Sequence, residues 1–423
     1  MRNNEIKIIV AHPGKQHSFR LATALHKEGM LDCYVTTIYD KESSLLMRLV
    51  KGLLKGDNLK RAKSRKNADI EDEKVVLFCQ LSGLIATVLN RIDRSLRVYR
   101  WYQNIVNQSF SLKVAKMAIR RNADAVIMYD ASAYKGMAYL KKHAPHIKRI
   151  MDVSIAARPH LKTIYQNEIE RSGDDTLMRE NMHLWDNIMM HIFQTEIDDT
   201  QYFLAASDFV KQSLIACGVT EKQVLIAPYG ANVSGECVDK SDPAKPLQLI
   251  FVGQVNMRKG IPHLLQAVSE IPEEDVELRL VGSYNDQDSF VKQYKNKKNI
   301  HFEGMVTLDK MKQYYEQSEV FVIASLAEGM AQVGIEALAC GLPIICSTNS
   351  GVSDLITEGK EGFVVPVGDI AALKEKIEWF IHHRKSIQQM SEAAHRIGKQ
   401  YTWERYNEQV VACVRSIMEA KPE

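Results

Sequence analysis

The sequence predicts an α/β protein with two doubly wound domains that face each other across a cleft. Its 423 residues exceed what one hydrophobic core usually covers. Short apolar runs alternate with helix-like runs, which is typical of parallel sheets covered by helices. A polar segment with two prolines, residues 236–246, interrupts this alternation once. We therefore expect an amino-terminal Rossmann-like domain over residues 1–235 and a carboxy-terminal one over residues 245–399, with residues 400–423 packing back on the first.

The first half supplies several apolar runs with strand character. A turn and a helix that ends before Gly29 follow the first run, and Ser207 is placed to cap the helix after the fourth. The segment "VVLFCQLSGLIATVLN", residues 75–90, is too short to span a membrane and is expected to be a buried helix. The expected strands are residues 6–11, 124–129, 148–153 and 202–207, and the segment "QVLIAPYG".

The second half repeats the pattern with six strand-like runs. They are "LQLIFVG", "ELRLVGS", "NIHFEG", "EVFVIAS", "LPIICS" and "GFVVPVG". Parallel sheets bind ligands at the carboxyl ends of their strands, so two such sheets place the natural site in the cleft between them.

The segment "SLAEGMAQVGIEALACG" carries the first candidate site. Glu328 follows the strand that ends at Ser325, and Glu336 lies one turn inside the next helix. Gly329 lets the backbone approach a ligand, and a helix amino terminus favours an anion such as phosphate. Phosphate with a carboxylate on each side suits a nucleotide sugar; the alternative is that Glu328 caps the helix and Glu336 pairs with a lysine. The free amides would belong to Met330, Ala331, Gln332 and Val333.

A second strand end carries "FVGQVNMRKGIPHLL". Gly253 frees the turn, and Arg258 and Lys259 come just before the following helix. Cations are unfavourable at the positive end of a helix unless an anion binds there, and a diphosphate would supply that anion. The alternative is a solvated basic turn.

Two strand ends of the first half face the same cleft. Gly14 in "AHPGKQHSF" would let the backbone approach a ligand from the opposite wall of the cleft. The GxGxxG dinucleotide fingerprint is absent from this loop, which weakens the interpretation as a simple dehydrogenase. Asp152 lies at the end of another strand and His160 follows that strand, where it is suited to donate a hydrogen bond or move a proton.

Charge and cysteine content restrict partners and location. Residues 1–205 hold 32 Lys and Arg against 23 Asp and Glu, with a concentration between Arg48 and Lys66. This segment is either a solvated face or a contact for an anionic membrane surface. Without interleaved aromatics it does not favour nucleic acid. The seven scattered cysteines indicate reduced thiols and no zinc site, so a cytoplasmic protein is expected. If the basic segment contacts lipid, the protein would be peripheral at the inner face of the cell membrane.

Together these motifs resemble glycosyltransferase family 4, whose members are retaining enzymes of the two-domain GT-B fold. The resemblance lies in "FVG…KG", "FEG", "EGMAQVGIEALACGLPII" with its E-x7-E spacing, and "EGFVVPVGD", and is strongest over residues 248–369. In the first half it is more diffuse, in "AHPGKQHSFRLATAL" and "DVSIAARPH". Two departures are Gln254, where the family often has arginine, and a first loop reduced to one glycine.

The resemblance implies transfer of a sugar from a nucleotide-diphosphate sugar to a glycan or lipid-linked acceptor in cell-surface polysaccharide synthesis. It requires neither a metal nor an organic cofactor if cations neutralise the leaving group. A GT-B epimerase or phosphorylase, with Asp130 and Asp152 as extra acids, and a non-catalytic nucleotide-sugar-binding protein remain alternatives. The implied catalytic residues are Lys259, Glu328 and His160, and the implied donor-binding residues are Gly14, Gly253, Arg258, Met330, Ala331, Gln332 and Glu336.

Overall fold

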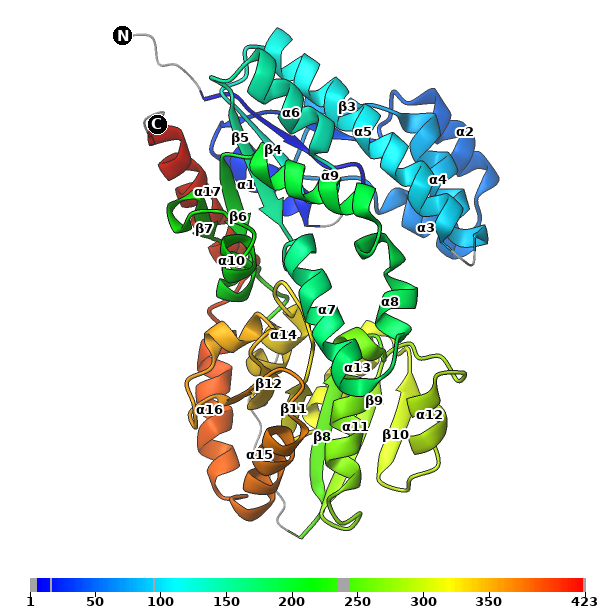
Figure 1. Ribbon diagram of the computed structural model, residues 1–423, viewed down its shortest axis with the longest axis vertical. Coiled ribbons are helices and arrows are strands. Elements are labelled where there is room, and N and C mark those ends of the chain that lie inside the picture. The colour runs from blue at the N-terminus through cyan, green and yellow to red at the C-terminus, as the bar shows by residue number, and fades with distance from the viewer. Residues whose placement is uncertain (1–5, 16, 94–95, 234–243, 421–423) are drawn as a thin grey trace.

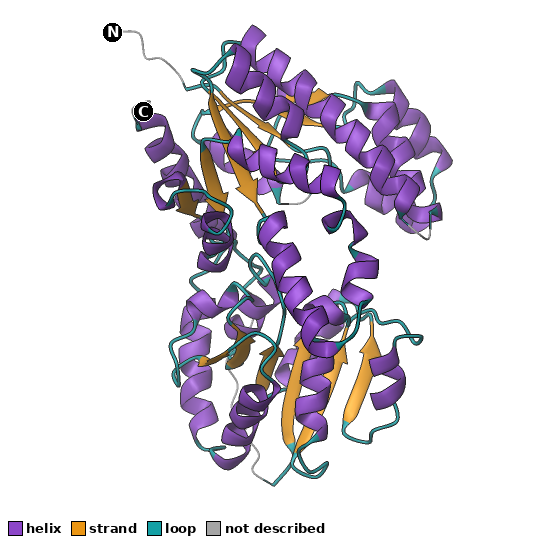
Figure 2. Ribbon diagram, in the orientation of Figure 1, coloured by secondary structure: helices purple, strands orange, loops and turns teal. Residues whose placement is uncertain are grey.

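The computed structural model describes residues 6–15, 17–93, 96–233 and 244–420. It contains two parallel sheets, each with helices on both faces, stacked one above the other in Figures 1 and 2. This is the two-domain α/β architecture that the alternating pattern predicts. Residues 236–243 of the expected linker lie outside the described residues, so the domain boundaries stay a prediction.

The amino-terminal sheet has seven strands in the order β3-β2-β1-β4-β5-β6-β7, all paired in parallel. Its interior strand β1, which lies between β2 and β4, is fully buried, as a continuous apolar run requires between two helical layers. The strands are β1 (Ile8–Ala11), β2 (Leu31–Thr36), β3 (Val75–Leu77), β4 (Ala125–Tyr129), β5 (Lys148–Val153), β6 (Tyr202–Ala205) and β7 (Val224–Ile226).

Helices connect these strands, and several are much longer than the connection requires. Ser207 caps α10 by accepting from the Val210 amide, as predicted. The helices of this half are α1 (Ser18–Lys27), α2 (Leu45–Leu53), α3 (Gly56–Lys63), η1 (Asp72–Lys74), α4 (Gln80–Ile92), α5 (Arg97–Arg120), α6 (Tyr134–His143), α7 (Arg158–Ser172), α8 (Thr176–Glu180), η2 (Met182–Leu184), α9 (Asn187–Asp198), α10 (Asp208–Ile215) and η3 (Glu221–Gln223).

The carboxy-terminal sheet has six strands in the order β10-β9-β8-β11-β12-β13. All six predicted runs form strands: β8 (Leu247–Val252), β9 (Val276–Val281), β10 (Ile300–Gly304), β11 (Val320–Ile323), β12 (Ile344–Ser347) and β13 (Gly362–Val365). Its helices are η4 (Met257–Lys259), α11 (Ile261–Ser269), α12 (Ser289–Tyr294), α13 (Leu308–Glu316), α14 (Gln332–Ala339), η5 (Val352–Leu355), α15 (Ile370–His382) and α16 (Ser386–Gly398).

The chain returns to the first domain through α17 (Trp403–Glu419), as predicted. This helix packs against α1, and the Arg20 guanidinium lies 4.8 Å from the Trp403 ring centroid. At the crossing, the Ala231 amide donates to the Tyr401 carbonyl at 3.0 Å. A β-carbon on Gly230 would lie 2.4 Å from the backbone of the returning segment, so only glycine fits there.

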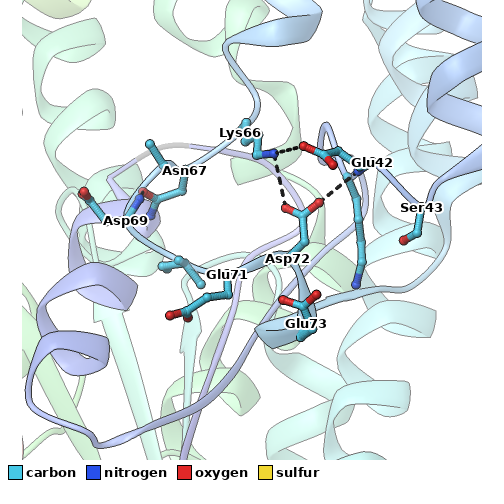
Figure 3. A pocket seen from close by; sticks show the side chains of 11 residues that line it. Glu42, Ser43, Lys66, Asn67, Asp69, Glu71, Asp72 and Glu73 are labelled. Atoms are coloured by element: carbon cyan, nitrogen blue, oxygen red, sulfur yellow. Dashed lines mark hydrogen bonds and ion pairs between the residues drawn. The ribbon is translucent and has the colours of Figure 1, made fainter.

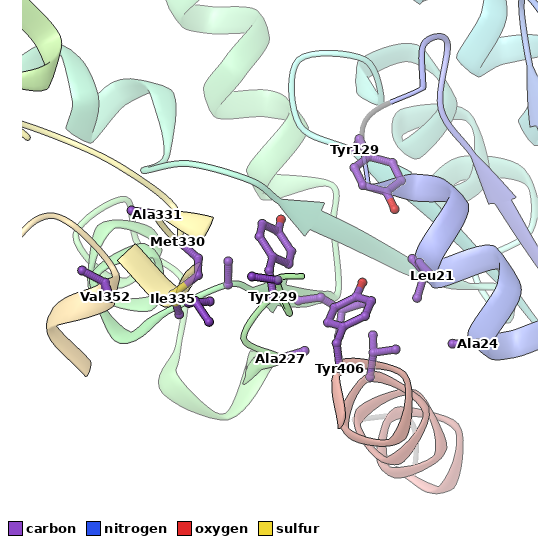
Figure 4. Close-up of a cluster of buried hydrophobic side chains, with 14 of the residues drawn as sticks. Leu21, Ala24, Tyr129, Ala227, Tyr229, Met330, Ala331, Ile335, Val352 and Tyr406 are labelled. Atoms are coloured by element: carbon purple, nitrogen blue, oxygen red, sulfur yellow. The ribbon is translucent and has the colours of Figure 1, made fainter. Parts of the chain in front are cut away.

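One buried cluster joins parts of both domains. Tyr229 and Tyr406, from the segment after β7 and from α17, lie on one side of it, and Met330 and Ile335 lie on the other (Figure 4). All four side chains are nearly inaccessible to solvent. The loop that carries Met330 and the start of the helix that carries Ile335 therefore rest on apolar contacts.

Two sequence expectations fail in the first half. Residues 75–90 form β3 and most of α4 rather than one buried helix, and Leu81 and Val88 are 62% and 55% exposed. Their spacing places them on one face of α4, which no other part of the described chain covers. Strand β2 was not predicted, because "LDCYVT" interrupts its apolar run with polar residues.

Candidate active site between the two domains

The turn after β8 brings two cations to the carboxyl ends of the strands. Gly253 has φ +145°, and Asn256 caps the turn by accepting from the Lys259 amide at 3.1 Å. A β-carbon on Gly260 would lie 1.9 Å from the Ala324 carbonyl oxygen, so this turn is pressed against the end of β11. Arg258 and Lys259 are thus held beside the loop that follows β11, not on a free surface turn.

Glu328 binds both cations. Its Oε1 lies 2.7 Å from Lys259 Nζ and also contacts Arg258 Nη1, which donates to the Ala327 carbonyl at 3.1 Å. The side chains of Glu328 and Lys259 are only 14% and 12% exposed. Burial lowers the Lys259 pKa, and the neighbouring carboxylate opposes that shift. The sequence alternative, in which Glu328 caps its helix, is not what this geometry shows.

The same loop leads into α14, which begins at Gln332 with Ala331 as its N-cap. The first amides of such a helix have no partner within it. Met330 and Ala331 are buried, whereas Gln332 is partly exposed. Glu336, one turn inside, is half-buried; burial raises its pKa and a hydrogen bond with the Tyr315 hydroxyl opposes the rise. Glu328 thus lies in the loop before α14, and Glu336 lies within that helix.

The amino-terminal domain touches this loop directly. A β-carbon on Gly329 would lie 1.9 Å from the Ser154 carbonyl oxygen, at the carboxyl end of β5. Helix α7 then runs from that strand end toward the second domain (Figure 1), where His263 Nε2 lies 2.9 Å from Glu168 Oε1. The Tyr165 hydroxyl of α7 interacts electrostatically with Arg258 and Glu328. Residues of both domains therefore line the site.

The predicted residues of the first domain have partners of their own. Asp152 Oδ1 lies 3.0 Å from His17 Nε2 and accepts from the Tyr229 hydroxyl at 3.3 Å. Asp130 pairs with Arg158 at 3.0 Å. Both acids proposed for the epimerase alternative are thus held in buried or half-buried networks.

Gly14 and His160 occupy the two strand-end loops that the sequence indicated. The Gly14 amide donates to His12 Nδ1 at 2.8 Å, which shapes the loop after β1. His160 lies in the first turn of α7, where burial lowers its pKa, and its backbone lies beside the Cys217 thiol. A direct role for either residue with the donor stays a prediction.

A cavity of about 1020 Å³ adjoins the cation cluster. One wall consists of the turns after β8 and β9, including Gln254 and Arg258, and the other of α8 and Arg100 of α5. Sequence reasoning missed Arg100, Arg158 and Tyr165, which border the site. No local signal marks them, because they come from helices that only the tertiary fold brings to the strand ends.

The basic segment of residues 48–66 covers most of α2 and all of α3. It offers a membrane less positive charge than its composition indicates, because some of its cations already pair with carboxylates. Lys66 Nζ lies 2.9 Å from Glu42 Oε1 and 3.7 Å from Asp72 Oδ1 (Figure 3), and Lys51 pairs with a carboxylate of the preceding loop. The remaining exposed cations include Arg48, Lys55, Arg61 and Lys63. Within the part of the chain that the structure describes, no helix has the length and apolar composition needed to cross a bilayer.

Comparison with known proteins bears on this site. Residues 238–397 match the family model of glycosyl transferases group 1. This match lies in the carboxy-terminal half of the chain. The chain is 27% identical over 169 residues to the sulfoquinovosyl transferase SQD2 of Arabidopsis thaliana, a match covering 39% of this chain and 32% of that protein. It is 32% identical over 142 residues to the capsular polysaccharide biosynthesis glycosyltransferase CapM of Staphylococcus aureus, covering 31% and 36%. The matches thus span about a third of these relatives.

The similarity of fold extends over both domains. The structure of HepE from Anabaena, solved in complex with UDP, superposes with a TM-score of 0.61 at 14% sequence identity, covering 97% of this chain and 100% of that one. At this identity the likeness concerns the fold, which is the GT-B arrangement expected from the sequence.

Proposed function

We propose that this protein is a retaining glycosyltransferase of family 4 that moves a sugar from a nucleotide-diphosphate sugar to a glycan or lipid-linked acceptor in cell-surface polysaccharide synthesis. The observation that carries this proposal is the contact of Arg258 and Lys259 with Glu328 beside the amino terminus of α14. Two cations and a helix terminus suit a diphosphate, and the carboxylate suits the hydroxyls of its sugar.

In the proposed reaction, the bond between the anomeric carbon and the diphosphate oxygen breaks while a bond to the acceptor hydroxyl oxygen forms, and the hydroxyl proton passes to the departing diphosphate. Negative charge grows on the departing diphosphate, and Lys259, Arg258 and the first amides of α14 stabilise it. Glu328 changes partners in the process, from the cations to the donor sugar. Because these cations neutralise the leaving group, the proposal requires no metal. Glu336 would hold the ribose, and Gly14, Gly253 and His160 would contact the donor from the loops around it.

Binding and transfer experiments test this proposal. The full chain should bind one of UDP, GDP or ADP in isothermal titration calorimetry, and Lys259→Ala should weaken that binding about ten-fold or more. The exposed Lys310→Ala variant is the control for loss of a charge on the same domain. Equal binding by wild type and Lys259→Ala would contradict the assignment of the cation.

The membrane part of the proposal concerns the exposed cations of α2 and α3. Flotation with vesicles of phosphatidylcholine and phosphatidylglycerol should carry the protein at low salt and less of it at high salt. Flotation that responds neither to salt nor to anionic lipid removes this part. The epimerase alternative predicts sugar-nucleotide isomerisation without acceptor, which the transferase does not.

A further inference from the structure

A second cavity lies in the amino-terminal domain, outside the loops that form the donor site. It has a volume of about 1210 Å³ and lies between α5, α8, η2 and the start of α9. Aromatic, methionine and isoleucine side chains dominate its wall, as in sites for apolar ligands. They include Trp101, Met178, Met182, Trp185, Ile188 and Phe193.

The same cavity is lined by cations. Arg97, Arg100, Arg158 and Arg179 face one acidic lining residue, Asp186, among the described residues. Asp186 is already used as the cap of α9, where it accepts from two amides at 2.8 and 3.2 Å. Arg158 and Arg179 also pair with carboxylates outside the lining, Asp130 at 3.0 Å and Asp175 at 2.8 Å. The lining itself thus combines a hydrocarbon surface with more cations than carboxylates.

Two of these arginines indicate room for an anion. Arg100 Nη2 donates to the Glu180 carbonyl oxygen at 2.7 Å, and burial lowers its pKa, an unfavourable effect that a bound anion would offset. Arg158 pairs with Asp130, yet its Nε is buried without a hydrogen-bond partner, as is His183 Nδ1 on the same wall. Phosphate oxygens accept hydrogen bonds of this kind bidentately from arginine.

The cavity leads toward the donor site. Arg100 and Arg179 also line the cavity of about 1020 Å³ whose opposite wall carries Arg258. The Tyr165 hydroxyl interacts electrostatically with Arg158 of one site and with Glu328 of the other. A ligand in the second cavity would thus present its polar end to the proposed donor sugar.

The outer end of the second cavity borders helices with exposed apolar side chains. Trp101 and Ile188 on the wall are 65% and 73% exposed. The exposed apolar side chains continue along α5 and along α4, which packs beside it, as a surface that we call the α4–α5 face. A soluble protein seldom leaves such a surface uncovered unless it contacts a partner or a membrane. Its members are Leu81, Ile85, Val88, Ile92, Val98, Trp101 and Ile105.

We propose that this cavity binds the acceptor, and that the acceptor is a lipid phosphate. Its apolar chain lies among the aromatic and methionine side chains, its phosphate binds the arginines, and a hydroxyl on the polar end beyond that phosphate receives the sugar. The α4–α5 face is where the chain would leave the bilayer. This inference rests on the proposed transferase function and narrows its acceptor to one chemical class.

The probe is dodecyl phosphate, used below its critical micelle concentration. Two control ligands accompany it: glycerol phosphate, which lacks the alkyl tail, and dodecanol, which lacks the phosphate. The full chain should bind dodecyl phosphate at least about ten-fold more tightly than either. Arg100→Gln and Ile188→Asn should each weaken that binding about ten-fold, whereas Arg120→Gln, at the far end of α5, should not. Tryptophan fluorescence reports binding, since two tryptophans line the cavity.

Each outcome decides the matter. Equal affinity for dodecanol and dodecyl phosphate, or no effect of Arg100→Gln, overturns the proposal. So does binding to anionic vesicles without binding to the monomeric probe, because the lipid headgroups of a surface would then be the ligand. UDP titration separates the two hypotheses: UDP binding without dodecyl phosphate binding defeats only the acceptor site, and the reverse defeats only the proposed donor function.

Discussion

The isosteric change Glu328→Gln tests whether this carboxylate occupies the place of the diphosphate charge in the unliganded site. Glu328 Oε1 lies 2.7 Å from Lys259 Nζ and contacts Arg258 as well. At that distance and an effective dielectric constant of about 20, one such pair is worth about 6 kcal/mol before desolvation is subtracted. Glutamine keeps a hydrogen bond to the cations but not the charge. We therefore expect the side chain at position 328 to compete with a bound diphosphate for the two cations less strongly, by about 1.5 kcal/mol.

Glu328→Gln should therefore bind the preferred nucleoside diphosphate about ten-fold more tightly than wild type. Transfer to acceptor should nevertheless fall about 10- to 100-fold, because the donor sugar loses a charged hydrogen-bond partner. Calorimetry measures the first effect and initial rates with sugar nucleotide the second. Glu316→Gln removes an exposed carboxylate of α13 in the same domain and serves as the control.

Unchanged or weaker diphosphate binding by Glu328→Gln would refute this reasoning, because the cations would then not be held by the carboxylate in solution. Equal transfer rates would refute the assignment of Glu328 to the donor sugar. The two outcomes are independent, so one experiment separates the electrostatic claim from the claim about the substrate.

Three further changes test other parts of the structure. Gly329→Ala places a β-carbon 1.9 Å from the Ser154 carbonyl, so the domains must separate; transfer should fall while nucleoside diphosphate binding remains, and X-ray scattering should show a larger radius of gyration. His12 is buried and its pKa is lowered to about 4, chiefly by burial, so the unfolded chain binds a proton first and stability should fall by about 3 kcal/mol between pH 6.5 and 4. Arg384→Ala removes the arginine partner of the Glu319 carboxylate, which is 3% exposed and then keeps the Gln248 amide, and should lower the free energy of unfolding by about 3 kcal/mol.

Each of these has a contrary result. Wild-type transfer by Gly329→Ala would show that the domains need not touch at this loop. Urea unfolding with the same pH dependence in wild type and His12→Gln would assign the acid instability elsewhere. If Arg384→Ala unfolds at the wild-type urea concentration, the pair is not an essential part of the core.

The sequence alone determined much of the carboxy-terminal half. Each of its six strands is a short apolar run bounded by turn residues, and such patterns depend on neighbours within a few positions. The loops with Lys259 and Glu328 follow strands directly, and parallel pairing then brings them to one edge whatever the rest of the chain does. Local spacing was therefore enough to group these residues.

Only the tertiary structure decided the amino-terminal surroundings of the site. Residues 75–90 look like a buried segment, but α4 packs against α5 and leaves Leu81 and Val88 exposed on a face that no other part of the described chain covers. Arg100 reaches the cleft only because α5 passes beside α8 and η2, more than 70 residues further along the chain. Whether a side chain is buried depends on which helix or strand packs against it, and whether a charge is neutralised depends on which side chains lie beside it. Sequence spacing predicts neither when the contacting residues are distant in the chain.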